Sequence, residues 1–215
     1  MPRKYIDLTL PYNNTISGFT WEHAKTLEKD GWNARSLHIY SHAGTHMDAP
    51  LHFGVSDRTI DNVPLSACNV RAWLVKLTDI TPSALIEVRH LGEELIAKIA
   101  PGDGIVFHTA WSKKIGTSEY RDQLPRISES LALWLVSKKV SLIGVEPPSV
   151  ADVNNLDEVT LIHQILLKGD IHIVEGLTNL ESLPTSKIDF WAVPLKIEGG
   201  DGAPCRAFAL IDDNL

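Results

Sequence analysis

The residues that could carry chemistry are concentrated in one short segment. His42-Ala-Gly-Thr-His46-Met-Asp48-Ala-Pro-Leu-His52 places three imidazoles and one carboxylate in eleven residues of a chain with nine histidines. Imidazole nitrogens and carboxylate oxygens are ligands that zinc prefers and that manganese and iron accept, whereas calcium and magnesium favour all-oxygen sites. The segment therefore predicts a transition-metal site, against the alternative of histidines gathered by chance.

Such a site requires the backbone to turn inside the segment. In a straight strand, at about 3.3 Å per residue, His42 and Asp48 would lie roughly 20 Å apart, too far to share an ion whose bonds are about 2 Å long. Gly44 supplies freedom for a turn, Thr45 a hydroxyl that can hold it or bind a ligand, and Pro50 prevents a helix from continuing. We therefore expect a turn within the segment.

A metal ion would need a further ligand from elsewhere in the chain. His163, His172 and Glu175 are candidates because they lie in or beside one predicted helix and the strand that follows it. His163 belongs to an otherwise apolar helix, where a ligand role would satisfy an imidazole that is costly to bury unpaired. The spacing alone does not choose among the three.

The elements expected to position these residues are mostly strands. Short β-rich runs occur at residues 5–10, 36–40, 70–77, 104–110, 140–145, 171–174, 188–195 and 205–211. Helical spacing of apolar residues occurs at 92–100, 128–139 and 156–168. Helix and strand alternate only in the middle of the chain, so we expect a mixed α/β fold rather than a simple doubly wound sheet.

Length and composition define the class of protein. The 215 residues are 44% hydrophobic and contain no repeat or polar linker, so we expect a single domain over residues 1–215. The net charge of −7, with dispersed Lys and Arg, disfavours a nucleic-acid partner. No apolar run approaches the roughly 20 residues that cross a bilayer, and Asp7 interrupts any signal-peptide core. We therefore expect a cytoplasmic protein with no membrane partner and a small-molecule substrate.

The pattern HxGTHxDxPxH, followed by Phe53, resembles the signature of the cyclase family, which includes bacterial kynurenine formamidases and isatin hydrolases. The opening Ile6-Asp-Leu-Thr9 and the closing segment 194–204 are also similar to family segments near both termini. One segment differs. Formamidases of the family carry a Trp-Pro-Gly-Asp type segment that contacts the aromatic substrate, whereas this chain reads Ile16-Ser-Gly-Phe-Thr-Trp21.

The resemblance implies a site and a fold. The implied metal ligands are two histidines and the aspartate of the motif, a helix histidine, and a glutamate twelve residues later: His42, His46, Asp48, His163 and Glu175. It implies further that Asp48 can bridge two ions and that His52 is the catalytic acid and base. The implied fold is a strand-rich swivelling β/β/α domain with mixed sheets. The implied assembly is a homo-oligomer, a dimer or a tetramer.

We therefore expect a metal-dependent amidohydrolase of the kynurenine formamidase type, with one or two zinc ions or, alternatively, manganese. A metal-bound hydroxide would attack the carbonyl of a small amide, cyclic amide or ester, with N-formylkynurenine of tryptophan catabolism as the specific case. Lactone or cyclic imide hydrolysis by the same site is the alternative. A metal-binding domain without turnover is disfavoured because no Cys cage is present, and a serine hydrolase because no GxSxG element occurs. The substrate-contacting residues are not predicted.

Overall fold

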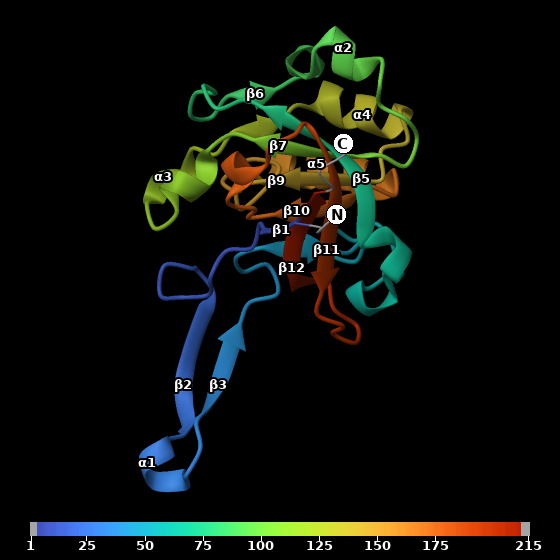
Figure 1. Ribbon diagram of the computed structural model, residues 1–215. Coiled ribbons are helices and arrows are strands. Elements are labelled where there is room, and N and C mark those ends of the chain that lie inside the picture. Colours follow the sequence, from blue (N-terminus) through green and yellow to red (C-terminus); the bar gives the residue numbers. More distant parts are fainter. Residues whose placement is uncertain (1–3, 212–215) are drawn as a thin grey trace.

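Eight strands form one mixed sheet in residues 4–211, the part of the chain that the computed structural model describes (Figure 1). In order of pairing they are β1 (Lys4–Asp7), β12 (Gly202–Ile211), β11 (Lys187–Pro194), β5 (Asn69–Lys76), β7 (Gly104–His108), β9 (Leu142–Val145), β10 (His172–Glu175) and β4 (His46–Asp48). The neighbours from β5 to β10 are parallel, and the other pairings are antiparallel. Because β4 pairs with both β10 and β12, the sheet closes into a barrel-like ring.

Both faces of β7 and β9 are buried, which explains their largely apolar sequences. Side chains of a strand alternate between its two faces. On β7, Val106 therefore packs inside the ring, whereas Ile105 and Phe107 pack against the layer of helices. Strand β9 follows the same alternation, with Leu142 inside and Ile143 outside.

Two helices form most of the outer layer. They are α4 (Glu129–Ser137) and α5 (Leu156–Lys168), which contact each other. The Ser128 side chain accepts a hydrogen bond from the Leu131 amide, and the Asn155 side chain accepts one from the Glu158 amide. Each helix therefore begins after a residue whose side chain caps its first turn. The predicted bounds of α5 are confirmed.

The remaining elements are short. They include α2 (Glu93–Ile96), α3 (Ser118–Asp122), the parallel pair β6 (Leu85–Ile86) and β8 (Arg126–Ile127), and 3₁₀ turns at Ile60–Asn62, Leu65–Ala67, Val88–Leu91, Trp111–Lys114 and Leu180–Ser182. The predicted helix over 92–100 is therefore wrong in its length, because only Glu93–Ile96 is α-helical. Pro101 disfavours helical backbone at the residue before it, and Gly102 turns the chain with a φ of 87°. Among residues 4–211, no helix is long and apolar enough to cross a membrane.

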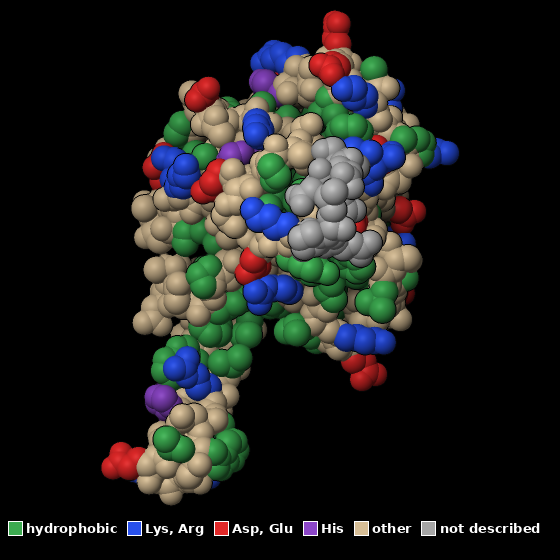
Figure 2. Space-filling view, in the orientation of Figure 1, with side chains coloured by type: hydrophobic (Ala, Val, Ile, Leu, Met, Phe, Trp, Pro, Cys, Tyr) green, Lys and Arg blue, Asp and Glu red, His purple; other side chains and the backbone are tan. Residues whose placement is uncertain are grey.

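A hairpin projects from the body as an arm (Figures 1 and 2). It consists of β2 (Phe19–Lys25), α1 (Leu27–Asp30) and β3 (Ala34–Ile39), with Trp21 opposite Leu37. Only the second of its strands was predicted. Strand β2 is mostly exposed and buries little apolar surface, so its burial does not follow the regular alternation of a half-buried strand. We refer to residues 19–39 as the arm.

Candidate active site

The motif segment turns sharply after β3, as its Gly and Thr predicted. Gly44 has a φ of 61°, in the left-handed region. The Thr45 hydroxyl donates a hydrogen bond to the Gly176 carbonyl at 2.6 Å and accepts one from the Leu10 amide at 2.9 Å. A Cβ atom at position 176 would lie 2.3 Å from the Gly44 carbonyl oxygen, so a side chain there would clash. These contacts fix the turn against the end of β10.

The pairing of β4 then sets the positions of the carboxylates. His46 lies opposite Glu175 on β10, and Asp48 lies opposite Gly202 on β12. The register places His46 Nε2 3.1 Å from Glu175 Oε2. It also brings Asp201, which precedes Gly202, beside the motif. Three-residue β4 was not predicted, because so short a segment carries no readable periodicity.

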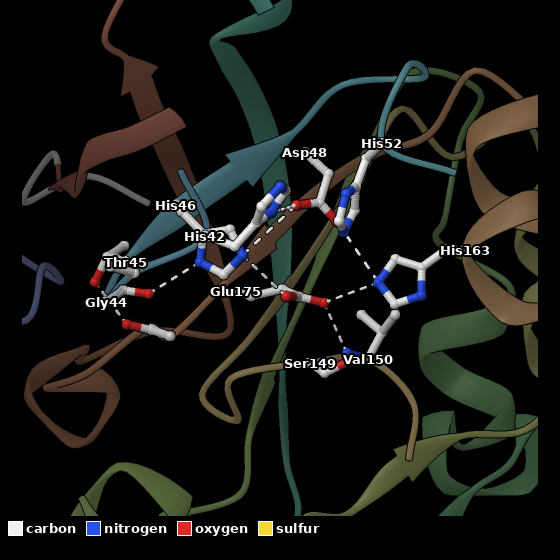
Figure 3. A network of polar contacts seen from close by, with 12 residues as sticks. His42, Gly44, Thr45, His46, Asp48, His52, Ser149, Val150, His163 and Glu175 are labelled. Atoms are coloured by element: carbon white, nitrogen blue, oxygen red, sulfur yellow. Dashed lines mark hydrogen bonds and ion pairs between the residues drawn. The ribbon is translucent and has the colours of Figure 1, made fainter. Parts of the chain in front are cut away.

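Two further histidines complete the cluster (Figure 3). His42, in the loop after β3, places Nδ1 2.9 Å from Asp48 Oδ1. His163, on α5, places Nε2 3.6 Å from Asp48 Oδ2 and 3.4 Å from Glu175 Oε1. The structure thus brings together all five residues that the sequence suggested as metal ligands.

The nitrogens and oxygens of this cluster are arranged as a cation would require. Nδ1 of His46 donates to the Gly44 carbonyl at 3.0 Å, and Nδ1 of His163 donates to the Val159 carbonyl at 2.7 Å. Both rings therefore direct an Nε2 lone pair towards the carboxylates. His46 Nε2 and Asp48 Oδ2 are buried without a hydrogen-bond partner within residues 4–211, since the contact between His46 and Glu175 is close but misaligned. Buried polar atoms are seldom left unpaired, so the cluster fits a bound metal ion.

Two sets of side chains could each surround an ion. One ligand atom from each of His42, Asp48 and His52 lies within 4.8 Å of the other two, and the same holds for His46, Asp48 and Glu175. Asp48 belongs to both sets. The first set also includes His52, which the resemblance implied to be an acid and base rather than a ligand.

The carboxylates draw positive charge into the cluster. Burial lowers the pKa of His42, but hydrogen bonds to Asp48 and Asp201 outweigh burial and raise that pKa to about 9. Burial likewise opposes protonation of His46 and His163, yet their contacts with Glu175 raise both pKa values. In turn, the pKa of Glu175 falls well below its usual range, because its two histidine partners outweigh the effect of burial.

Asp201 is a site residue that the sequence reasoning missed. Its Oδ2 atom lies 3.0 Å from His42 Nε2 and 3.6 Å from His52 Nδ1. Burial raises the pKa of Asp201, but the hydrogen bond and charge of His42, together with hydrogen bonds from Ser41 and the backbone, lower it by more. The closing segment 194–204 contains Asp201 but carries no pattern that would have distinguished it. Only the closure of β12 onto β4 brings it to the motif.

A cleft opens beside the cluster. Its volume is about 310 Å³, and its walls include His52, His163 and Glu175. The Phe53 ring stacks on His163 with centroids 4.2 Å apart, and Tyr40 also lines the cleft. By contrast, His172, the competing ligand candidate, lines a separate cavity.

The comparisons with known proteins agree with this geometry. The model of the family described as "Putative cyclase" matches residues 6–152. The chain belongs to the cyclase family. This member is 32% identical to a kynurenine formamidase of Salinibacter ruber, over 88% of this chain and 85% of that protein. It is 28% identical to a kynurenine formamidase of Bacillus anthracis, over 95% and 96% of the two chains.

The fold of this cyclase-family member also matches solved structures. Isatin hydrolase A from Ralstonia solanacearum superposes with a TM-score of 0.88 at 22% identity, covering 98% of this chain and 92% of that one. The predicted family and its strand-rich fold with mixed sheets are therefore confirmed.

Proposed function

We propose that this protein is a metal-dependent hydrolase of small amides and that N-formylkynurenine is its substrate. The observation that carries the proposal is the cluster of His42, His46, Asp48, His163 and Glu175, in which two buried polar atoms have no hydrogen-bond partner within residues 4–211. A structural metal site without turnover usually closes four ligands around the ion. Here the cluster borders an open cleft. The two kynurenine formamidases support the choice of substrate.

The five residues would hold one or two divalent ions, with Asp48 between the two positions. Zinc suits this mixture of imidazole and carboxylate ligands, and manganese is the alternative. When bound, such an ion supplies a water of lowered pKa and polarises the substrate carbonyl.

His52 would transfer the proton of the attacking water to the leaving group. Its Nδ1 atom faces Asp201, so Nε2 is the nitrogen left to take a proton from the attacking water and return it to the leaving nitrogen. Burial lowers the pKa of His52, so the ring is neutral and able to accept a proton at neutral pH. Phe53 and Tyr40 offer aromatic surfaces to an aryl substrate.

The experiment is reconstitution. Metal-free protein is loaded separately with zinc and manganese and assayed on N-formylkynurenine, on isatin, and on a small panel of lactones and cyclic imides. We expect metal-restored release of formate from N-formylkynurenine. Turnover of another panel member alone would keep the metal hydrolase and reject the formamidase. Inactivity across the panel with either metal would reject the proposed function.

The cellular setting follows the same reasoning. We propose a cytoplasmic enzyme, in a compartment where a small-molecule substrate reaches the cleft. We also propose that it is a homo-oligomer, a dimer or a tetramer, for which the exposed arm is the structural argument.

A further inference from the structure

Arg121, on α3, is the one Lys or Arg side chain that lines the cleft, as far as residues 4–211 are concerned. It also lines a second cavity of about 340 Å³, whose walls include Leu10, Ile16 and Ile115. Ser17, His42, Arg121 and Pro148 border both cavities. Arg121 therefore lies where the cleft beside the metal-ligand cluster meets a more apolar extension.

Neighbouring residues hold the guanidinium group in place. Arg121 Nη1 donates to Asp122 Oδ1 at 2.8 Å and to Asn154 Oδ1 at 2.9 Å. Asn154 Nδ2 donates to the same Asp122 oxygen at 3.2 Å, which ties the three side chains together. Within the described part of the chain, no hydrogen bond uses Nε or Nη2 of Arg121. One edge of the guanidinium is thus both positioned and free.

That edge has the geometry of a carboxylate site. Nε and one Nη of an arginine present two parallel N–H donors that match the two oxygens of a carboxylate. Asp122 also lines the second cavity, so a carboxylate oxygen lies next to the guanidinium. A neighbouring cation and anion complement the two charges of an α-amino-acid head group.

We propose that Arg121 determines substrate specificity by binding a carboxylate of the substrate at the end remote from the scissile amide, with Asp122 receiving the adjacent ammonium group. The scissile amide then lies at the cluster of histidines and carboxylates, and an aryl ring lies in the cleft that Phe53 and Tyr40 help to line. The site accordingly selects amides that carry an amino-acid head group over neutral amides. This inference rests on the proposed function.

The test compares two formamides that differ only at the remote end. N-formylkynurenine carries the head group, and N-(2-acetylphenyl)formamide keeps the formamide and the aryl ketone without it. We expect Arg121→Ala to raise KM for N-formylkynurenine by about 10- to 100-fold, the range for a lost hydrogen bond to a charged group, with a much smaller change in kcat. The KM for the neutral formamide should change far less. Arg121→Lys and Asp122→Asn should have intermediate effects.

Arg89→Ala is the matched control, because Arg89 is an exposed arginine on the Val88–Leu91 turn that lines neither cavity. It should leave both KM values within twofold of wild type. An equal loss on both formamides in Arg121→Ala would overturn the inference and leave the hydrolase standing.

Binding of kynurenine, measured by calorimetry on the metal-loaded protein, separates the two proposals. If neither formamide is hydrolysed, the proposed function fails. Arg121 as a carboxylate site then stands if Arg121→Ala weakens kynurenine binding tenfold or more, and falls if it does not. Circular dichroism and thermal melting of each variant check that the fold is intact.

Discussion

His42 and His52 lie with their rings stacked, 3.7 Å between centroids, yet their surroundings differ. Each nitrogen of His42 faces a carboxylate, Asp48 on one side and Asp201 on the other. His52 has one carboxylate contact, at 3.6 Å, and burial lowers its pKa. A proton at this pair therefore belongs on His42 in the metal-free protein. His52 is left neutral, which suits a base that accepts a proton from water.

His52→Ala tests the assignment of His52 as the acid and base. The variant should keep its metal and lose turnover by about 10²- to 10⁴-fold, the usual contribution of a general acid or base. Metal content by mass spectrometry is measured beside kcat. Activity within a few fold of wild type would show that His52 is not the acid and base. Loss of metal would instead make it a ligand, in line with its place in the first set of ligand atoms.

Asp201 should act through His42. A carboxylate that accepts a hydrogen bond from a ligand histidine fixes its tautomer and ring orientation, and removing such a partner commonly costs about 10- to 100-fold in metal affinity. We expect Asp201→Ala to weaken zinc binding by that factor in a competition titration, and Asp201→Asn to weaken it less. Asp170→Ala is the control, since Asp170 is an exposed aspartate paired with Arg58 in another part of the surface. Unchanged affinity in Asp201→Ala would refute this role.

The free energy of unfolding of the metal-free protein should fall as the pH rises from 6.5 to 9. The pKa of His42 is raised from 6.5 to about 9 in the folded state. Its stabilising contribution is therefore complete below pH 6.5 and is lost as the pH rises towards 9. At about 1.4 kcal/mol per pKa unit, the loss in the free energy of unfolding is at most about 3 kcal/mol. His46 and His163, whose pKa values are also raised, add to this loss in the same direction, whereas Glu175, with a lowered pKa, adds no slope in this window.

Urea unfolding of the metal-free protein at several values between pH 6 and pH 9 measures this slope. His42→Gln should reduce the slope without abolishing it, because His46 and His163 still titrate with raised pKa values. A wild-type stability that is constant or rises across the window would contradict the assignment of the proton to His42.

At the scale of elements, the predictable parts are those with a long apolar pattern. Helix α5 and strands β5, β7 and β11 were predicted within one or two residues because each buries a continuous or regularly spaced face. Strand β4 could not be predicted in this way, because its sequence, His46-Met-Asp48, contains a single apolar residue. The motif revealed which residues gather at the site. It did not reveal Asp201 or Arg121, whose positions depend on long-range pairing and on a five-residue helix.

The junction of β4 and β10 provides an element-scale prediction. Gly176 and Gly102 both have positive φ, 67° and 87°, so alanine is strained at either position. Only at Gly176 would the new Cβ meet backbone, 2.3 Å from the Gly44 carbonyl oxygen, whereas Gly102 has open space. We expect Gly102→Ala to lower the free energy of unfolding by about 1 kcal/mol and Gly176→Ala by at least about 3 kcal/mol.

Metal affinity is the second measurement that distinguishes Gly176→Ala from Gly102→Ala. Gly176→Ala should also weaken metal binding, because the clash separates the motif turn from the residue next to Glu175. Denaturant titration and metal affinity check both effects. Equal destabilisation by the two variants would show that the close approach has no energetic weight.

At the scale of the whole molecule, the arm exposes apolar side chains that nothing in a single copy of the chain, over residues 4–211, covers. A two-stranded ribbon is marginally stable in water without further packing. Yet Leu27, Trp32 and Leu37 are each more than half exposed on this ribbon. At the base of the arm, Tyr12, Ile39 and other residues border a cavity of about 480 Å³ (Figure 2). A second copy related by a two-fold axis could cover both surfaces at once, since such an interface is self-complementary.

The arm therefore carries the prediction of a homo-oligomer. We expect sedimentation velocity to show a dimer or tetramer for the wild type and a shift towards monomer for the double variant Trp32→Ser with Leu37→Ser. Leu65→Ser is the matched control, because Leu65 is 76% exposed on the Leu65–Ala67 turn and should leave the assembly intact. The arm lies outside the metal-ligand cluster, so a monomeric variant should still bind metal. A wild type that sediments as a monomer, or a double variant that keeps its assembly, would assign the exposed apolar face of the arm to some other partner.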